Sequence, residues 1–199
     1  MSTPPKRLDH QVIVGMVHEG SRVLDLGCDE GDLLERLRDE KKANVQGVEL
    51  NQQAIYKCIA KGLSVVHSDL DSGLVGFPDQ SFDYVILNQS LQEVRNIDLL
   101  LRESFRVARR TIVGFSNFGA LTARWQLGVL GRAPVTGSLP YSWHDTPNLR
   151  FLTIRDFRHY CATHQIQVRR AVFLGRNHRT RLFPNLFADQ AILELVAKK

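Results

Sequence analysis

Apolar residues along this chain fall into two patterns, short continuous runs and stripes with helical spacing. The continuous runs, which are typical of buried strands, lie at positions 23–26, 45–50, 63–67, 82–87, 111–115, 167–174 and 190–196. The helical stripes lie at positions 8–16, 32–41, 51–61, 97–109 and 153–164. Strands separated by such helices need right-handed crossovers, which favour a mostly parallel sheet covered on both faces. The pattern therefore predicts an α/β fold with a doubly wound, mostly parallel, seven-stranded, Rossmann-like sheet.

Residues 117–152 interrupt this alternation. A weaker helical pattern reaches about Leu130, and the residues that follow include glycines and prolines with aromatic residues between them, at Gly131, Pro134, Gly137, Pro140 and Pro147. A stretch of this kind is typical of an ordered insertion without regular structure of its own. Because the length of 199 residues suits one domain, we expect a single domain over residues 1–199 with an irregular insertion at about 117–152.

Composition narrows the class of protein. With 43% apolar and 24% charged residues, the chain has the composition of a globular protein and not of a disordered, collagen-like or disulfide-rich one. No run approaches the roughly 18–20 apolar residues of a membrane span, and no apolar signal core follows Lys6 and Arg7. We therefore expect a cytoplasmic protein without a membrane partner. The three cysteines lack a Cys-x-x-Cys spacing and the histidines occur singly, so neither a disulfide nor a metal site is expected.

Charge is divided unevenly between the two halves of the chain. Residues 1–99 carry 10 basic and 16 acidic side chains, whereas residues 100–199 carry 16 basic and 5 acidic ones. The densest basic run, residues 169–181, has two interpretations: a solvated face that offsets the acidic half, or a surface for an anionic or acidic partner. Aromatic residues do not alternate with these arginines, so a nucleic-acid partner is not expected.

Glycines follow the first predicted strand, in the sequence Asp25-Leu26-Gly27-Cys28-Asp29-Glu30-Gly31. Glycine is needed where a strand turns sharply into a helix, and also where the backbone must approach a ligand. An acidic residue inside an apolar strand, such as Asp25, needs backbone donors or a cationic ligand. Glu49 ends the second predicted strand, 22 residues after Gly27, where an acid can accept hydrogen bonds from the hydroxyls of a ribose.

A dinucleotide-binding site is not favoured, because the loop has no G-x-G-x-x-G pattern. The loop instead resembles the D-x-G-x-G-x-G motif of the class I S-adenosylmethionine-dependent methyltransferase superfamily, with Asp29 in place of the middle glycine. Aspartate tolerates the left-handed backbone region better than most residues, which is compatible with ligand binding. The resemblance implies a pocket for S-adenosylmethionine or S-adenosylhomocysteine, without a metal, formed by Asp25, Gly27, Cys28, Gly31, Glu49, Leu50, Asp69, Leu70 and Asn88.

Further segments resemble one small family, the methionine biosynthesis protein MetW. They are residues 81–87, 91–92, 106–110, 116–119, 131–136, 139–148 and 153–157. The resemblance spans nearly the whole chain and includes the insertion, which a generic methyltransferase would not have in this order. It implies a protein that supports homoserine O-acylation as the partner of a MetX-type homoserine O-acyltransferase, and it implies no particular methyl acceptor.

Two functions therefore stay open. The favoured one is a ligand-binding partner of the acyltransferase, and the alternative is an S-adenosylmethionine-dependent methyltransferase that acts on a small metabolite. No catalytic residue is assigned, because methyl transfer depends mainly on positioning and needs no covalent nucleophile.

The aromatic residues of the insertion have three interpretations. As a lid, Tyr141, Trp143, His144 and Asp145 would line an acceptor site, with a histidine that titrates near neutral pH. As a packed loop, they would be buried against the sheet edge. As an interface, they would anchor a protein partner, and residues 132–150 would form a docking surface together with the basic run 169–181.

Overall fold

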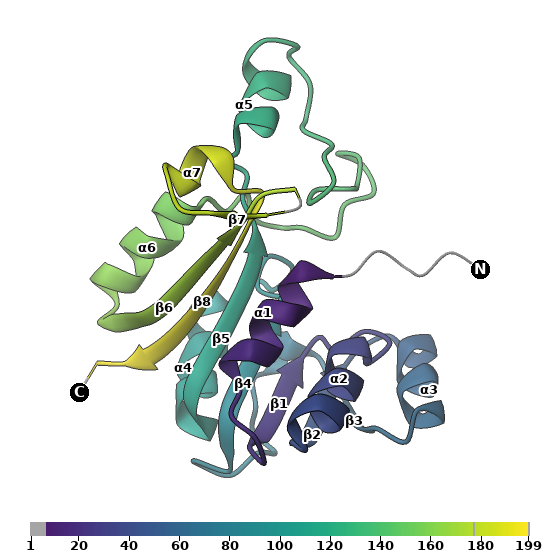
Figure 1. Cartoon of the computed structure of the whole chain (residues 1–199). Coiled ribbons are helices and arrows are strands. Elements are labelled where there is room, and N and C mark those ends of the chain that lie inside the picture. Colours follow the sequence, from purple (N-terminus) through teal and green to yellow (C-terminus); the bar gives the residue numbers. More distant parts are fainter. Residues whose placement is uncertain (1–6, 177, 199) are drawn as a thin grey trace.

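One mixed sheet of eight strands runs through the computed structural model, which describes residues 7–176 and 178–198 (Figure 1). The order of strands across the sheet is β3-β2-β1-β4-β5-β8-β6-β7. In chain order they are β1 (Arg22–Leu26), β2 (Asn44–Glu49), β3 (Ser64–His67), β4 (Phe82–Asn88), β5 (Ala108–Ser116), β6 (Ile166–Leu174), β7 (Arg179–Thr180) and β8 (Gln190–Ala197). All seven predicted strands are present.

Parallel pairing joins β3, β2, β1, β4 and β5, whereas β8 lies antiparallel between β5 and β6. The predicted mostly parallel sheet is thus confirmed. The sequence pattern does not predict the eighth strand, β7. There the chain turns back after β6, with the Gly175 N–H donating to the carbonyl of His178, and Arg179–Thr180 pairs with the end of β6. Two residues are too few to show a strand period.

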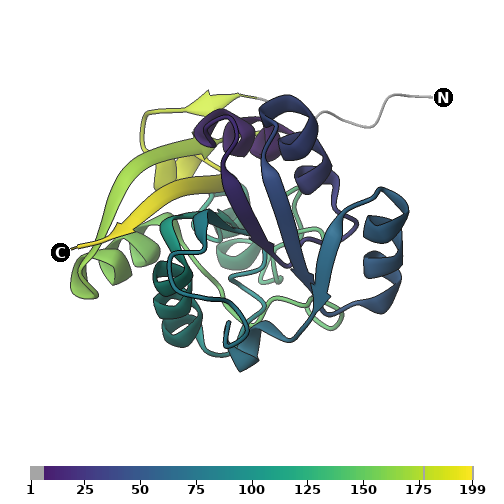
Figure 2. The same ribbon diagram turned by 90° about the horizontal axis from the view of Figure 1, so that it is seen from below.

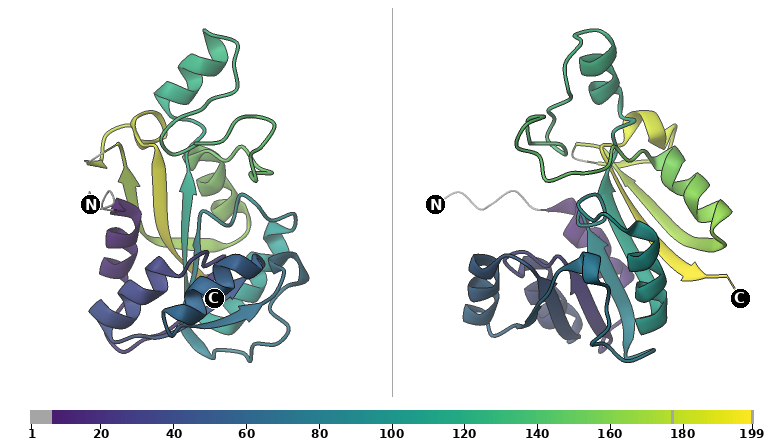
Figure 3. Two further views of the ribbon diagram at one scale, coloured as in Figure 1. Left: turned by 90° about the vertical axis from the view of Figure 1, so that its right-hand side faces the viewer. Right: turned by 180° about the vertical axis from the view of Figure 1, so that it is seen from behind.

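Helices cover both faces of the sheet (Figures 2 and 3). One face packs against α1 (Leu8–Met16), α2 (Asp32–Lys41) and α3 (Gln52–Ala60), and the other packs against α4 (Ile97–Val107) and α6 (Ile154–Thr163). The shorter elements are α5 (Leu121–Gly128), α7 (Pro184–Phe187) and the 3₁₀ turn η1 (Leu70–Ser72). No helix within the described part of the chain is long and apolar enough to cross a membrane.

The central strands are apolar on both faces because helices bury both. Along β1, the side chain of Val23 belongs to the core beneath α1 and α2, whereas the side chain of Leu24 belongs to the core on the opposite face, which α4 and α6 cover. The polar residue Asn96 begins α4, where its side chain accepts a hydrogen bond from the Leu99 N–H.

The insertion begins where β5 ends, and Figure 1 shows α5 and the loop after it projecting beyond that end of the sheet. The buried side chain of Asn117 holds the start of the insertion in place. The Asn117 amide donates to the carbonyls of Ala188 at 2.7 Å and Asn185 at 3.2 Å, and its oxygen accepts the N–H groups of Gly119 and Ile154. One side chain thus joins the insertion to α6 and to the segment around α7.

A second buried amide, Gln92, holds the far part of the insertion. Its side-chain oxygen accepts the Ser116 N–H at 2.9 Å, and its amide group donates to the carbonyls of Ser116 and Arg150. The backbone carbonyl of Gln92 accepts the Leu149 N–H at 2.9 Å. Most of these backbone groups lie in the insertion or at the ends of β5, α6 and α7, where no sheet ladder continues, so the two amides supply partners that a ladder would otherwise provide.

The first prediction concerns Asn117. Its replacement by alanine leaves buried backbone donors and acceptors without partners, which should lower the free energy of unfolding by about 3 kcal/mol. Urea denaturation measures this value. The matched control is Asn148→Ala in the same insertion, which should change the free energy of unfolding by no more than about 0.5 kcal/mol. Equal effects of the two substitutions would contradict the anchoring role of Asn117.

Candidate functional site

Parallel strands end at one edge of the sheet, and in this protein the loops beyond those ends surround a cleft of about 1240 Å³. This volume is sufficient for a nucleoside-sized ligand. Eight of the nine predicted site residues line the cleft: Asp25, Gly27, Cys28, Glu49, Leu50, Asp69, Leu70 and Asn88. The ninth, Gly31, does not line it.

The two glycines of the first loop have different surroundings. Both adopt positive φ angles, 78° at Gly27 and 79° at Gly31, which L side chains rarely adopt. A Cβ atom on Gly31 would lie 2.5 Å from Leu63 Cδ1 and 2.9 Å from Cys58 Sγ. Gly31 is therefore needed for the packing of α2 beside α3. Gly27 lines the cleft, and a Cβ atom there would lie 2.8 Å from Ser90 Cβ.

Asp29, which stands where the methyltransferase motif has a glycine, has a left-handed φ of 47° and an exposed side chain. Its backbone N–H donates to Glu49 Oε2 at 2.9 Å. Asp29 thus adopts the left-handed conformation that aspartate tolerates better than most residues. Asp29 itself lines the cleft, so its carboxylate adds to the acidic character of the site.

Glu49 joins the loops after β1 and β2. Its Oε1 atom accepts the N–H groups of Leu50 at 2.9 Å and Asn51 at 2.8 Å, and its Oε2 atom accepts that of Asp29. A carboxylate oxygen has two acceptor positions, so Oε1 is fully used and Oε2 keeps one. The remaining position on Oε2 is available to a hydroxyl group of a ligand.

Asp25 is buried in β1 below these loops, and we find no hydrogen-bond donor to its carboxylate among the described residues. Burial, together with the nearby charge of Glu49, raises the pKa of Asp25 to about 8. The residue is therefore largely protonated at neutral pH. A cationic ligand in the cleft would favour its ionised form.

Helix α1 brings residues to the cleft that the sequence analysis did not include: Arg7, Asp9 and His10. The buried carboxylate of Asp9 accepts hydrogen bonds from the Arg7 guanidinium at 2.6 Å and the Asn88 amide at 3.0 Å. Burial alone would raise the pKa of Asp9, but these hydrogen bonds dominate and lower it to about 2. The pKa of His10 is lowered to about 4 by burial and by Arg7, so the imidazole is neutral.

Acidic side chains outnumber basic ones around the cleft. The described residues that line it include three arginines, at positions 7, 95 and 176, and nine acids: Asp9, Asp25, Asp29, Glu30, Asp32, Glu49, Asp69, Asp71 and Glu93. Such a site attracts a cation and disfavours the phosphates of a dinucleotide. No group of three or more metal-ligating side chains with suitable geometry occurs within residues 7–176 and 178–198.

The insertion forms one wall of the cleft through Ser138, Pro140, Tyr141, Pro147 and Asn148. The Ser116 hydroxyl lies 2.9 Å from Gln89 Oε1 and 2.5 Å from the Ser138 carbonyl oxygen, which ties this wall to the end of β4. One aromatic residue of the insertion lines the cleft, and others are exposed to solvent.

Tyr141 lines the cleft, whereas Trp143 is 79% exposed, so the interpretation that the aromatic side chains are all buried in a packed loop is wrong. His144 and Asp145 are exposed and do not line the cleft. A lid that places this pair at an acceptor site is not what the structure shows.

Solved structures place the fold in a known class. A protein from Thermotoga maritima, described as an S-adenosylmethionine-dependent methyltransferase and possible histamine N-methyltransferase, matches with a TM-score of 0.70 at 15% identity, over 96% of this chain and 88% of that one. A protein from Archaeoglobus fulgidus, described as an S-adenosylmethionine-dependent methyltransferase, matches with a TM-score of 0.66 at 17% identity, over 96% of this chain and 91% of that one. The chain thus has the Rossmann-like fold of class I methyltransferases, as predicted.

Sequence comparisons identify the family of this chain more narrowly than the fold does. The profile of the methionine biosynthesis protein MetW matches residues 7–195. A curated relative from Rhodopirellula baltica, a bifunctional methionine biosynthesis protein MetXA/MetW, is 37% identical over 199 aligned residues, which cover 94% of this chain and 32% of that protein. The chain therefore belongs to the MetW family. It spans 32% to 49% of the length of three curated relatives.

The second prediction concerns the pH dependence of stability. Because the folded protein holds a proton on Asp25 up to about pH 8 and the unfolded chain releases it near pH 4, unfolding in this window releases a proton. The contribution of Asp25 to the free energy of unfolding is therefore present at low pH and falls as the pH rises, by up to about 1.4 kcal/mol per pH unit. Asp25→Asn should remove this slope.

Urea denaturation of the parent and of Asp25→Asn at pH 5, 6, 7 and 8 measures the difference. The advantage of the variant should grow with pH, whereas the exposed control Asp145→Asn should follow the parent. Parallel curves for the parent and Asp25→Asn would show that Asp25 is already ionised at pH 5.

Proposed function

We propose that this protein binds S-adenosylmethionine or S-adenosylhomocysteine in the cleft and acts in methionine biosynthesis as the partner of a MetX-type homoserine O-acyltransferase. The observation that carries the ligand part is the excess of acidic side chains at the strand ends. S-adenosylmethionine carries a positive sulfonium and a positive ammonium group, and S-adenosylhomocysteine carries the ammonium group. Neither compound has a phosphate. The partner part is supported by family membership and by the relative named MetXA/MetW, which is one chain.

The residues of the cleft fit such a nucleoside. The free acceptor position on Glu49 Oε2 suits a ribose hydroxyl, and the side chain of Leu50, 59% exposed at the cleft, offers an apolar surface for an adenine ring. When bound, S-adenosylmethionine would supply an electrophilic methyl group, whereas S-adenosylhomocysteine would supply none.

A binding role fits this site better than methyl transfer. Asn88, at the end of β4, donates to Asp9, and its side-chain oxygen is buried, so this oxygen is not presented to an acceptor in the cleft. The low pKa of His10 makes this imidazole a weak base. The other histidine considered for acceptor activation, His144, lies outside the cleft. Methyl transfer to a small metabolite is the competing function, and the third prediction separates the two.

The third prediction is that titration calorimetry detects binding of both S-adenosylmethionine and S-adenosylhomocysteine. Glu49→Ala should weaken binding at least about tenfold, because it removes the ribose acceptor and frees three backbone N–H groups of the surrounding loops. The matched control is Glu40→Ala on α2, whose carboxylate pairs with Arg36 at the surface and which should bind as the parent does.

Two results would count against the proposal. The ligand assignment would be contradicted if neither ligand gave heat at millimolar concentration. It would also be contradicted if Glu49→Ala and the parent bound the ligands equally well. Production of S-adenosylhomocysteine by this chain alone, when it is mixed with S-adenosylmethionine and a metabolite extract, would favour the methyltransferase function instead.

A further inference from the structure

Large apolar side chains are exposed along the insertion. The exposed fractions are 79% for Trp143 and 72% for Phe151, and on α5 they are 57% for Trp125 and 62% for Leu127. A pair of hydrogen bonds between the Gln126 side chain and the backbone of residue 135 holds α5 against the loop that follows it. Exposed apolar residues concentrated in one ordered segment mark a surface that another molecule covers.

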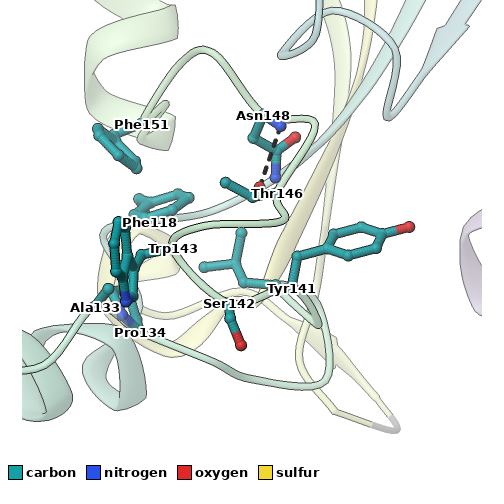
Figure 4. Close-up of a pocket in the computed structure, with 10 residues that line it drawn as sticks. Phe118, Ala133, Pro134, Tyr141, Ser142, Trp143, Thr146, Asn148 and Phe151 are labelled. Atoms are coloured by element: carbon teal, nitrogen blue, oxygen red, sulfur yellow. Dashed lines mark hydrogen bonds between the residues drawn. The ribbon is translucent and has the colours of Figure 1, made fainter.

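A small apolar pocket opens within this segment. Figure 4 shows the ring of Trp143 beside that of Phe118, with Phe151 close by and the ring of Tyr141 pointing to the opposite side. The rings of Phe118 and Phe151 meet edge to face with their centres 4.7 Å apart. The pocket measures about 70 Å³, which is room for the end of one apolar side chain. Pockets of this kind receive the anchor residues of protein partners.

The segment that forms the pocket carries a net positive charge. Residues 117–152 contain Arg124, Arg132 and Arg150 but a single acid, Asp145. All three arginines are exposed. Within the described part of the chain none of them pairs with a carboxylate: Arg124 and Arg150 donate to backbone carbonyls. An apolar surface with unpaired guanidinium groups is complementary to an apolar side chain surrounded by acidic residues.

We propose that this apolar face of the insertion, centred on Trp143 and Phe151, is the docking surface for the homoserine O-acyltransferase. The proposal rests on the proposed function and adds the place of contact and the chemistry of the partner's surface. The acyltransferase presents an apolar side chain to the pocket and acidic side chains to Arg132 and its neighbours. The relative whose single chain is named for both proteins supports this occupant over a second copy of the present chain.

The docking surface and the ligand cleft share a wall. Tyr141 and Asn148 line both the apolar pocket and the cleft. Few residues separate Tyr141 from Asn148 in the sequence. The residue that follows Asn148 is held by the hydrogen bond from the Leu149 N–H to the Gln92 carbonyl. A ligand that contacts Tyr141 from the cleft therefore acts on the same loop that the acyltransferase contacts, so the two binding events influence each other.

The fourth prediction tests the surface by binding kinetics between the full chain and the purified homoserine O-acyltransferase of the same cell. Trp143→Ala should raise the dissociation constant at least about tenfold, mainly through faster dissociation, because it removes the large aromatic side chain that lines the pocket. Arg132→Ser should slow association at low salt, and the difference should shrink as salt screens the charges. Both residues are exposed, so thermal unfolding of the variants should match that of the parent.

The controls are an aromatic and an arginine on other surfaces. Tyr56→Ala on α3, 54% exposed, and Arg102→Ser on α4, also exposed, should bind the acyltransferase as the parent does. If the parent binds and Trp143→Ala binds equally well, the docking surface is elsewhere and the proposed function stands. If the parent chain itself does not bind the acyltransferase, the proposed partner is wrong and this inference fails with it.

Discussion

The structure depends on the way in which the chain is held after β5. At this point the backbone leaves the sheet for the long insertion, and its polar groups lose the partners that a ladder would supply. Two buried amides, Gln92 and Asn117, provide those partners and connect the insertion to β4, α6 and the segment around α7. Since buried backbone groups cannot be left unpaired cheaply, these hydrogen bonds give an irregular segment one conformation. That conformation closes one side of the cleft and exposes the apolar pocket on the other.

The acidic cleft is tolerated because its charges are neutralised in three ways. Glu49 accepts three backbone N–H groups, Asp9 pairs with Arg7 and Asn88, and Asp25 holds a proton at neutral pH. These arrangements leave a site that is still negative at its rim and has one free acceptor position at Glu49. A positively charged nucleoside without phosphates matches that description. A dinucleotide does not, because the acidic side chains repel its phosphates.

Much of the fold follows from sequence because buried parallel strands have continuous apolar runs, and the helices between them have clear stripes. The site residues on the strands could be predicted for the same reason: Glu49 and Asn88 end parallel strands and Asp25 is the last residue but one of β1, so all three lie at one edge of the sheet. The contact between Asp9 and Asn88 could not, because it joins residues 79 positions apart and nothing local in either segment indicates it. Gly31 shows a different limit. Gly27 and Gly31 have the same sequence signal, and only the structure shows that a Cβ atom would meet Ser90 beside the cleft at Gly27 but Leu63 and Cys58 beneath α2 at Gly31.

The central claim is that this chain acts on the acyltransferase as a ligand-binding partner, and the most direct test is the rate of homoserine O-acylation. The acyltransferase would be assayed alone, with an equimolar amount of this chain, and with the chain saturated with S-adenosylhomocysteine. The account predicts that the chain raises the rate and that the ligand changes the size of this increase. An acylation rate that is identical in all three mixtures would contradict it.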